Sequence, residues 1–422
     1  MIKKKWIKGI IFFLLFLFIG YFLISNIDKT ANNPKYKKKL WEFSLNTFLS
    51  LPDPIKSTIM VVSGKRTFSN LFNDYNVKFL PDTQLIKIDF SRKNINFENK
   101  NKKKFYIEKY NNQIIVANKF GEFFTTKSDL LTSKEKNIFK KIKVKNLHDI
   151  QGDILDLLVI DKTIYVSKIS NFPDCTKLEI YSSEIKEEFD FSIFKSFDEC
   201  KSISIGAGRI KHYFYQNQHG ILISTNDSDN DNPGSKAQDN SSIFGKILFI
   251  DIIKKDHSLV STGHRNVQGL FVKENIILAT EHGPRGGDEI NKIIHGENYG
   301  WPIVSYGNSY LSKELKYLKS HKENGFREPL HAFVPSIGIS ELIILPNNFN
   351  TKWKNNALVT SLNGRSIYRV KFEDKSFDKI LYVEKIFIGE RIRDILYVDN
   401  SKLILVALER TGNIGILRNI TD

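Results

Sequence analysis

The chain has 422 residues, 41% of them hydrophobic and 26% charged, which excludes a disordered protein and suffices for one large or two medium domains. A net charge of +16 is typical of nucleic-acid-binding proteins, and the basic run 100–104 is of the kind they carry. The lysines are nevertheless spread over many predicted turns instead of one helix face. We therefore interpret them as solvated turn residues and expect no nucleic-acid partner.

The first thirty residues differ from the rest of the chain. Lysines precede an apolar run over 9–24, and no charged residue follows this run before Asp28. Such a segment is a signal peptide or a membrane anchor. The run is long for a signal peptide and no small-residue cleavage site follows it, so an uncleaved transmembrane anchor over 1–30 is favoured. The lysines hold the N-terminus in the cytoplasm, which predicts an inner-membrane protein whose remaining chain faces the periplasm.

A repeated pattern fills most of the remaining sequence. Residues 31–100 give no clean pattern, and we interpret them as a tether and a short N-terminal extension. From residue 101 to 422 the chain repeats one unit, in which a strand of alternating apolar residues is followed by a short polar turn and a second strand. Six such units occur, at 105–119, 154–169, 210–225, 267–281, 339–362 and 392–408.

Most units are followed by a further pair of strands, which gives about four strands in each. A four-stranded sheet cannot bury both of its faces unless neighbouring sheets stack around an axis. The sequence therefore predicts an all-β protein, a six-bladed β-propeller over 101–422, with little helix. An open β-sandwich array is the alternative, but six hairpins of similar register favour the propeller. Loops at one end of a propeller channel converge, so residues far apart in sequence can form one site.

The chain contains two cysteines, Cys175 and Cys200. In an oxidising compartment they favour one disulfide, and in a reducing compartment they are two thiols. Because the predicted anchor places the domain outside the cytoplasm, we favour the disulfide. Two cysteines in different loops are too few for a metal cluster.

The most specific pattern lies between residues 263 and 301. It contains the motifs GHRN, EHGPRGGDEIN and NYGWP, with glycines and acidic residues placed directly after predicted strands. Together with the segments 151–156, 237–248 and 389–394, these motifs resemble the soluble quinoprotein sugar dehydrogenases of the glucose/sorbosone dehydrogenase family. The resemblance covers roughly 151–418 and implies a six-bladed propeller that uses pyrroloquinoline quinone and calcium to oxidise a sugar or alcohol.

The resemblance also implies roles for individual residues. It assigns Gln151 and Arg265 to catalysis. It assigns cofactor binding to Arg265, Asn266, Asn363, Arg365, Arg391 and Arg393. It assigns calcium binding to the backbone carbonyls of Gly283 and Pro284, whose hard oxygen atoms suit that ion. A second ion is implied at Asp288, Glu289 and the Tyr299 carbonyl, for which a plain turn hydrogen-bond network is an equal alternative.

The residue pattern alone supports one of these roles. The quinone carries three carboxylates, so its site requires several cations. Arg391 and Arg393 are two residues apart on a predicted strand, project to the same face and can together bind carboxylates. The alternative for such a pair is a solvated sheet edge.

Two positions depart from the family pattern. The family's general base is a histidine four residues before an arginine, and here Ile205 precedes Arg209 at that spacing. Isoleucine cannot accept a proton, and general-base assistance contributes about 10²–10⁴ in rate. His212 is an odd number of residues further along a strand and points to the opposite face. The second departure is Asn363, which stands where the family has a quinone-binding lysine, and Arg365 is the candidate replacement cation.

Two hypotheses follow. The first is an exported, membrane-anchored, quinone- and calcium-dependent sugar or alcohol dehydrogenase with an altered base. The second is a propeller of the same descent that has no catalytic activity and binds a carbohydrate or protein ligand, because Ile205 and Asn363 both lie in the expected site.

Overall fold

The computed structural model describes residues 86–98, 104–147, 151–200, 206–216, 218–227, 236–309 and 317–420. Within these ranges the regular structure consists of strands and four short 3₁₀ turns. None of the described segments is a helix of the length and hydropathy that crossing a membrane requires. The anchor predicted over 1–30 lies outside the described residues and stays a prediction.

The strands form six sheets, and all neighbouring strands in them are antiparallel except β5 and β9, which pair in parallel. The innermost strand of each sheet is β2 (Phe105–Tyr110), β6 (Ile154–Ile160), β11 (Ile210–Tyr215), β15 (Val267–Lys273), β19 (Ile339–Ile344) or β23 (Ile392–Val398). The strands outside them are β1 (Ile88–Asn94), β3 (Gln113–Asn118), β4 (Phe123–Lys127), β5 (Lys140–Lys145), β7 (Thr163–Asn171), β8 (Thr176–Glu184), β9 (Glu188–Asp190), β10 (Ser192–Ser196), β12 (Gln218–Ser224), β13 (Ile247–Asp251), β14 (His257–Ser261), β16 (Ile276–Glu281), β17 (Asp288–Ile293), β18 (His331–Phe333), β20 (Asn356–Ser361), β21 (Ser366–Phe372), β22 (Ile380–Phe387), β24 (Leu403–Leu408) and β25 (Asn413–Asn419). The 3₁₀ turns are η1 (Ser128–Thr132), η2 (Lys236–Gln238), η3 (Lys322–Asn324) and η4 (Thr351–Trp353).

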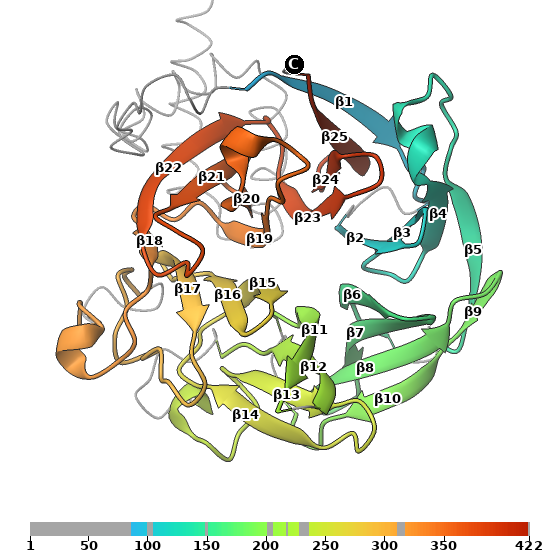
Figure 1. Cartoon of the computed structure of the whole chain (residues 1–422). Coiled ribbons are helices and arrows are strands. Elements are labelled where there is room, and N and C mark those ends of the chain that lie inside the picture. Colours follow the sequence, from blue (N-terminus) through green and yellow to red (C-terminus); the bar gives the residue numbers. More distant parts are fainter. Residues whose placement is uncertain are drawn as a thin grey trace, which may run out of the picture. The chain divides into compact units, whose positions relative to one another are not determined.

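The sheets are the blades of a propeller, as Figure 1 shows, and their inner strands surround the central axis, along which the channel of a propeller runs. Each inner strand contacts the inner strands of the two neighbouring blades, which closes the ring. The predicted six-bladed fold is therefore confirmed, and all six predicted hairpins form the two inner strands of a blade.

The last blade is completed by the start of the described chain. Strand β1 pairs antiparallel with β25, so the sheet has the order β1-β25-β24-β23. The propeller thus begins before residue 101, where the sequence analysis placed its start. The sequence analysis missed this strand because the alternation of apolar and polar residues over 88–94 is weak. Closing the ring with strands from both ends of the propeller ties the first and last blades together.

Six apolar cores lie between adjacent blades, one for each pair of neighbours. Leu155 and Ile223, for example, join the second and third blades, and Phe105 and Leu405 join the first and last. Inner and middle strands are therefore buried on both faces, and this burial is the dominant stabilising contribution to the ring.

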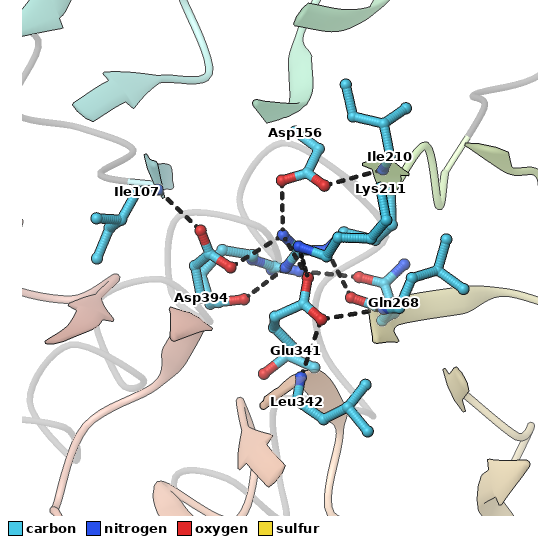
Figure 2. Close-up of polar contacts among 12 residues, drawn as sticks. Ile107, Asp156, Ile210, Lys211, Gln268, Glu341, Leu342 and Asp394 are labelled. Carbon is cyan, nitrogen blue, oxygen red and sulfur yellow. Dashed lines mark hydrogen bonds and ion pairs between the residues drawn. The ribbon is translucent and has the colours of Figure 1, made fainter. Parts of the chain in front are cut away.

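A buried ionic cluster joins the blades around the channel. The guanidinium of Arg209, whose side chain is 2% exposed, lies 3.0 Å from Asp156, 3.1 Å from Asp394 and 3.3 Å from Glu341. These acids come from β6, β23 and β19, and Figure 2 shows them converging from three sides. The three carboxylates could hold a metal ion by their spacing, but the Arg209 side chain already occupies the centre.

Each of the three acids also binds the inner strand of a neighbouring blade. Their second carboxylate oxygens accept hydrogen bonds from the backbone N–H groups of Ile210 in β11 (3.0 Å), Leu270 in β15 (3.0 Å) and Ile107 in β2 (2.8 Å) (Figure 2). All six inner strands are thereby linked in pairs, and Arg209 links the pairs to one another.

Removing the charge of Arg209 should destabilise the propeller strongly. Arg209→Met removes the cation that contacts all three buried carboxylates and leaves Lys211, whose Nζ lies 3.5 Å from Glu341, as the nearby cation. Breaking a buried pair in this way costs about 3–5 kcal/mol. Urea unfolding of the two proteins measures this difference. The control is Arg418→Met, which breaks an exposed pair with Asp89 and should cost below about 1 kcal/mol. Equal destabilisation by both variants would contradict the central role of Arg209.

Candidate functional site

The inner strands begin at one end of the channel, which we call the mouth. Because the blades are related by rotation about the channel axis, their inner strands run in the same direction. The predicted catalytic and cofactor-binding residues lie shortly before or at the start of an inner strand or in the turn from β20 to β21, namely Gln151, Arg265, Asn266, Asn363, Arg365, Arg391 and Arg393. The fold therefore gathers residues from four blades at one end.

Arg391 and Arg393 project to the same side, as predicted. Both bind one carboxylate, that of Glu409, which follows β24: Arg391 Nε lies 2.8 Å and Arg393 Nη2 3.0 Å from its oxygens. These two arginines lower the pKa of Glu409, although burial acts in the opposite direction. Arg393 is buried and also donates to the side chain of Gln268, whereas Arg391 is about half exposed. A carboxylate that enters the mouth can therefore reach Arg391.

Arg265 lies over the indole of Trp301, with its guanidinium carbon 5.1 Å from the ring centre. It donates to the backbone carbonyls of His282 (3.2 Å) and Gly283 (3.1 Å). The Gly283 carbonyl, which the resemblance assigns to calcium, is thus hydrogen-bonded to a cation in this structure. Arg265 and that carbonyl group are in direct contact, which fixes the direction of the guanidinium.

Glu281 orders the turn that carries Arg265 and Asn266. Its carboxylate accepts hydrogen bonds from the backbone N–H groups of both residues and pairs with Nδ1 of the fully buried His264. Nε2 of His264 in turn contacts the Ser261 hydroxyl at 2.8 Å. His264 is therefore used in fixing the turn and is enclosed by protein.

Three of the five proposed metal ligands surround one small cavity. Gly283, Glu289 and Tyr299 all line it, and it has room for about one water-sized sphere. Glu289 Oε1 lies 3.4 Å from His321 Nε2, and its other oxygen accepts from Asn291. Burial, followed by the charge of Glu281, raises the pKa of Glu289 well above its usual value. Two buried acids at a water-sized cavity form an environment in which a bound cation would be stabilised.

Asp288 and Pro284, the other two proposed metal ligands, do not line this cavity. Both oxygens of Asp288 accept backbone hydrogen bonds, one from Gly283 and the other from Ile337 and Ile339. Asp288 is therefore part of a turn network that connects two blades, which is the alternative that the sequence left open for it. Pro284 is outside the lining of the cavity.

The turn from β20 to β21 carries Asn363 and Arg365. Asn363 is exposed and packs beside Gly338 at the start of β19. The carbonyl of Arg365 accepts from the N–H groups of Ile388 and Gly389. These contacts hold the turn next to the segment that leads to Arg391, so Arg365 belongs to the mouth.

The expected general-base position, Ile205, lies outside the described residues. Its neighbour Gly206 donates its N–H to Asn226, and a side chain at Gly206 would approach the Asn266 side chain to 3.3 Å. Gly206 therefore lies on the same side of the mouth as Asn266. His212 is exposed and contacts His219, with 3.4 Å between ring nitrogens, consistent with its expected direction away from that loop.

Both cysteines are free thiols in the structure, and their side chains are in hydrogen-bond contact. Hydrogen bonding to Cys200 raises the pKa of Cys175. The disulfide stays a prediction, between two thiols that are already neighbours.

Sequence reasoning missed Glu281, Glu409 and Lys104 as parts of the mouth. The first two had a usable signal, since each is an acidic residue directly at the end of an apolar strand and opposite predicted arginines. Lys104 was included in a basic run interpreted as solvated, and its surroundings depend on contacts with distant strands.

The pair of arginines makes the stability contribution of Glu409 dependent on pH. Its pKa is lowered in the folded protein, so its contribution is present above the unfolded-state pKa and is lost as pH falls through the folded-state pKa. Glu409→Gln should therefore destabilise the protein at pH 7, and the difference from the unmodified protein should shrink below pH 4. Urea unfolding at both pH values measures it, with the exposed Glu373→Gln as control. A difference that does not change with pH would exclude this account.

Comparison with known proteins gives the site its context. The family described as Glucose / Sorbosone dehydrogenase matches residues 111–418, from the turn after β2 to Arg418 in β25. Aldose sugar dehydrogenase YliI of Escherichia coli K12 is 28% identical over 158 residues, covering 36% of this chain and 42% of that protein. Quinoprotein glucose dehydrogenase B of Acinetobacter calcoaceticus is 26% identical over 236 residues, covering 43% and 47%. The chain thus spans about half the length of the curated relatives it matches.

Solved structures agree on the fold. The apo form of the soluble aldose sugar dehydrogenase of Escherichia coli aligns with a TM-score of 0.63 and 17% identity, covering 80% of this chain and all of that one. The PQQ-bound aldose sugar dehydrogenase of Streptomyces coelicolor aligns with a TM-score of 0.57 and 15% identity, covering 80% and 99%. Because the family match extends over most of the chain and through all six blades, the chain belongs to the glucose/sorbosone dehydrogenase family.

Proposed function

We propose that this protein is a pyrroloquinoline quinone- and calcium-dependent oxidoreductase that oxidises a hydroxyl group of an aldose or a similar sugar or alcohol. The observation that carries the proposal is the position of Arg265, Arg391 and Arg393 at one channel mouth, where the turn of Arg365 adjoins the segment before Arg391 and Arg265 lines a cavity with buried acids. The proposal includes an inner-membrane anchor over 1–30 and a catalytic domain in the periplasm, supported by the charge pattern around 9–24.

The residues of the mouth fit a small molecule with several carboxylates. Arg391 offers a half-exposed guanidinium and Arg393 is buried, and both already pair with the carboxylate of Glu409. The relatives that these comparisons find include a quinoprotein and a PQQ-bound enzyme, which favours the quinone over other polycarboxylates. When bound, the quinone supplies a carbonyl carbon that accepts a hydride from the substrate.

The cavity at Glu289 fits calcium by the chemistry of its donors. Glu289 would provide a carboxylate and Gly283 and Tyr299 would provide nearby backbone oxygens. Burial raises the pKa of the Glu289 carboxyl, so a cation bound in the cavity would favour its ionised form. A bound cation would also reduce the attraction of the Gly283 carbonyl for Arg265, leaving that guanidinium available to the ligand.

The chain's own residues then have separate tasks. Arg391 and Arg393 orient an anionic ligand by its carboxylates. Arg265, fixed through Glu281 and Trp301, directs positive charge toward the mouth, where negative charge develops on a polarised oxygen. Gln151, exposed directly before β6, can donate a hydrogen bond to a sugar hydroxyl.

A specific observation favours a second candidate function. The position that the family uses for proton abstraction is Ile205, and the position of its lysine is Asn363. A propeller with these residues can retain the ligand-binding mouth and bind a carbohydrate or protein without oxidising it.

Direct titration separates the two candidates. The purified full-length protein is mixed with pyrroloquinoline quinone and calcium, and the visible spectrum and dye reduction are followed over a panel of aldoses. The proposal expects a spectral shift at micromolar protein, and Ile205→His should raise turnover by about 10²-fold or more because it supplies a base. Arg393→Gln, which removes a cation of the mouth, is the binding-deficient control.

The outcomes are distinct. The absence of a shift would exclude quinone binding. A shift without turnover, unchanged by Ile205→His, would favour the non-catalytic binding protein.

Calcium binding is tested by thermal stability. Calcium should raise the unfolding temperature of the unmodified protein, since a ligand that binds only the folded state stabilises it. Glu289→Gln removes one ligand and should abolish most of this increase, whereas Glu135→Gln, on an exposed surface, should leave it intact. An equal increase in all three proteins would show that calcium binds elsewhere.

A further inference from the structure

One cation of the mouth has no assigned role. Lys104 directly precedes β2, and its Nζ lies 5.5 Å from the centre of the Tyr106 ring, beside which the Arg209 guanidinium carbon lies at 5.0 Å. Among the described residues we find no hydrogen bond or ion pair of the Lys104 side chain. By contrast, Arg209, Arg391 and Arg393 each have a carboxylate partner.

The topology places Lys104 beside the arginine pair. Strands β2 and β23 are neighbours in the ring, and the Ile107 N–H donates to Asp394 at 2.8 Å. The two strands run in the same direction, so three residues before each of these positions the chain reaches Lys104 on one strand and Arg391 on the other. Lys104 is therefore at the same end of the channel as Arg391.

The electrostatic surroundings support this placement. The charged and titratable groups that act on Lys104 come from three other blades and from its own strand, namely Arg393 of β23, Glu409 after β24, Asp153 before β6, Arg209 before β11 and Tyr106 of β2. The nearest acids have other cationic partners, since Lys119 binds Asp153 and the arginine pair binds Glu409. Lys104 is thus a cation in a polar, partly exposed position that is available to an incoming anion.

We propose that Lys104 is a further anion-binding residue of the mouth, which binds a carboxylate of the same ligand that Arg391 and Arg393 hold. This inference rests on the proposal that the mouth binds a carboxylate-bearing ligand. Position 363 has an asparagine instead of a lysine, and Lys104 would supply a lysine to the mouth from a different blade.

The proposal has a proton-linked consequence. Burial, followed by the charge of Arg393, lowers the pKa of Lys104 from 10.5 to about 7, so the amine is largely neutral above that pH. An anion binds the protonated form better. Binding should therefore take up a proton near pH 7 to 8, and affinity should fall as pH rises through this range.

Calorimetric titration tests the inference with two probes, because the carboxylate could belong to the quinone cofactor or to a sugar acid. Full-length protein with calcium is titrated with pyrroloquinoline quinone in one arm and with galacturonate in the other, at pH 6.5 and pH 8.5 and in two buffers of different ionisation enthalpy. At pH 6.5, Lys104→Gln should weaken binding by roughly tenfold to a hundredfold, the range for a hydrogen bond to a charged group.

The conservative variant separates charge from structure. Lys104→Arg should restore most of the affinity but remove proton uptake and the loss of affinity at pH 8.5, because arginine remains protonated. Lys109→Gln, on the same strand but paired with Asp399 at the surface, is the matched control and should behave like the unmodified protein. Burial disfavours the charged form of Lys104, so the Lys104→Gln protein should remain folded. Its urea unfolding curve checks this.

The outcomes separate this inference from the proposed function. If the quinone binds equally well to the unmodified protein and to Lys104→Gln, the inference is wrong and quinone binding stands. If the quinone fails to bind but galacturonate binds in a Lys104-dependent manner, the inference stands and quinone dependence fails. If neither probe binds the unmodified protein at pH 6.5, the inference is overturned as well.

Discussion

The interaction on which this propeller depends is the contact of one buried guanidinium with three carboxylates from different blades. Apolar packing holds each blade to its neighbours, but it acts only between adjacent pairs. Arg209 connects blades across the channel, and its acids fix the backbone N–H groups of three further inner strands. In a low-dielectric environment such a network is stable only when every partner is present, which makes it a strict geometric constraint.

This cluster also determines the geometry of the mouth. Arg209 Nε donates to the carbonyl of Gln268, and Nη2 donates to the carbonyl of Arg393. Gln268 contacts the side chains of Asn266 and Arg393. The ionic cluster around Arg209 therefore fixes the relative positions of the strands that carry the cations of the mouth. A ligand that binds these cations meets a preorganised arrangement.

The sequence predicted the blades well because each inner hairpin alternates apolar residues around a short turn, a local signal. It did not reveal β1, whose alternation is weak and whose place depends on pairing with β25, more than 300 positions further along the chain. Residues of the mouth could be predicted only from the motif at 263–301 and from the pair Arg391 and Arg393.

Partners within the site were less accessible to sequence reasoning. Asp156 and Asp394 both fell inside recognised motifs, but their common partner Arg209 is 53 and 185 residues away from them. Lys104 shows the opposite failure. A local basic run indicated a solvated turn, whereas in the folded ring this lysine is only partly exposed and lies among charged groups of three other blades. Burial of a charge is decided by distant strands, so composition alone cannot predict it.

The most direct test of the account is a crystal structure of the protein soaked with pyrroloquinoline quinone and calcium. The account predicts density for the quinone at the mouth, with its carboxylates against Arg391, Arg393 and Lys104, and density for a cation in the cavity at Glu289. Quinone density on another surface, or an unchanged mouth with Arg391 and Arg393 still bound only to Glu409, would contradict it.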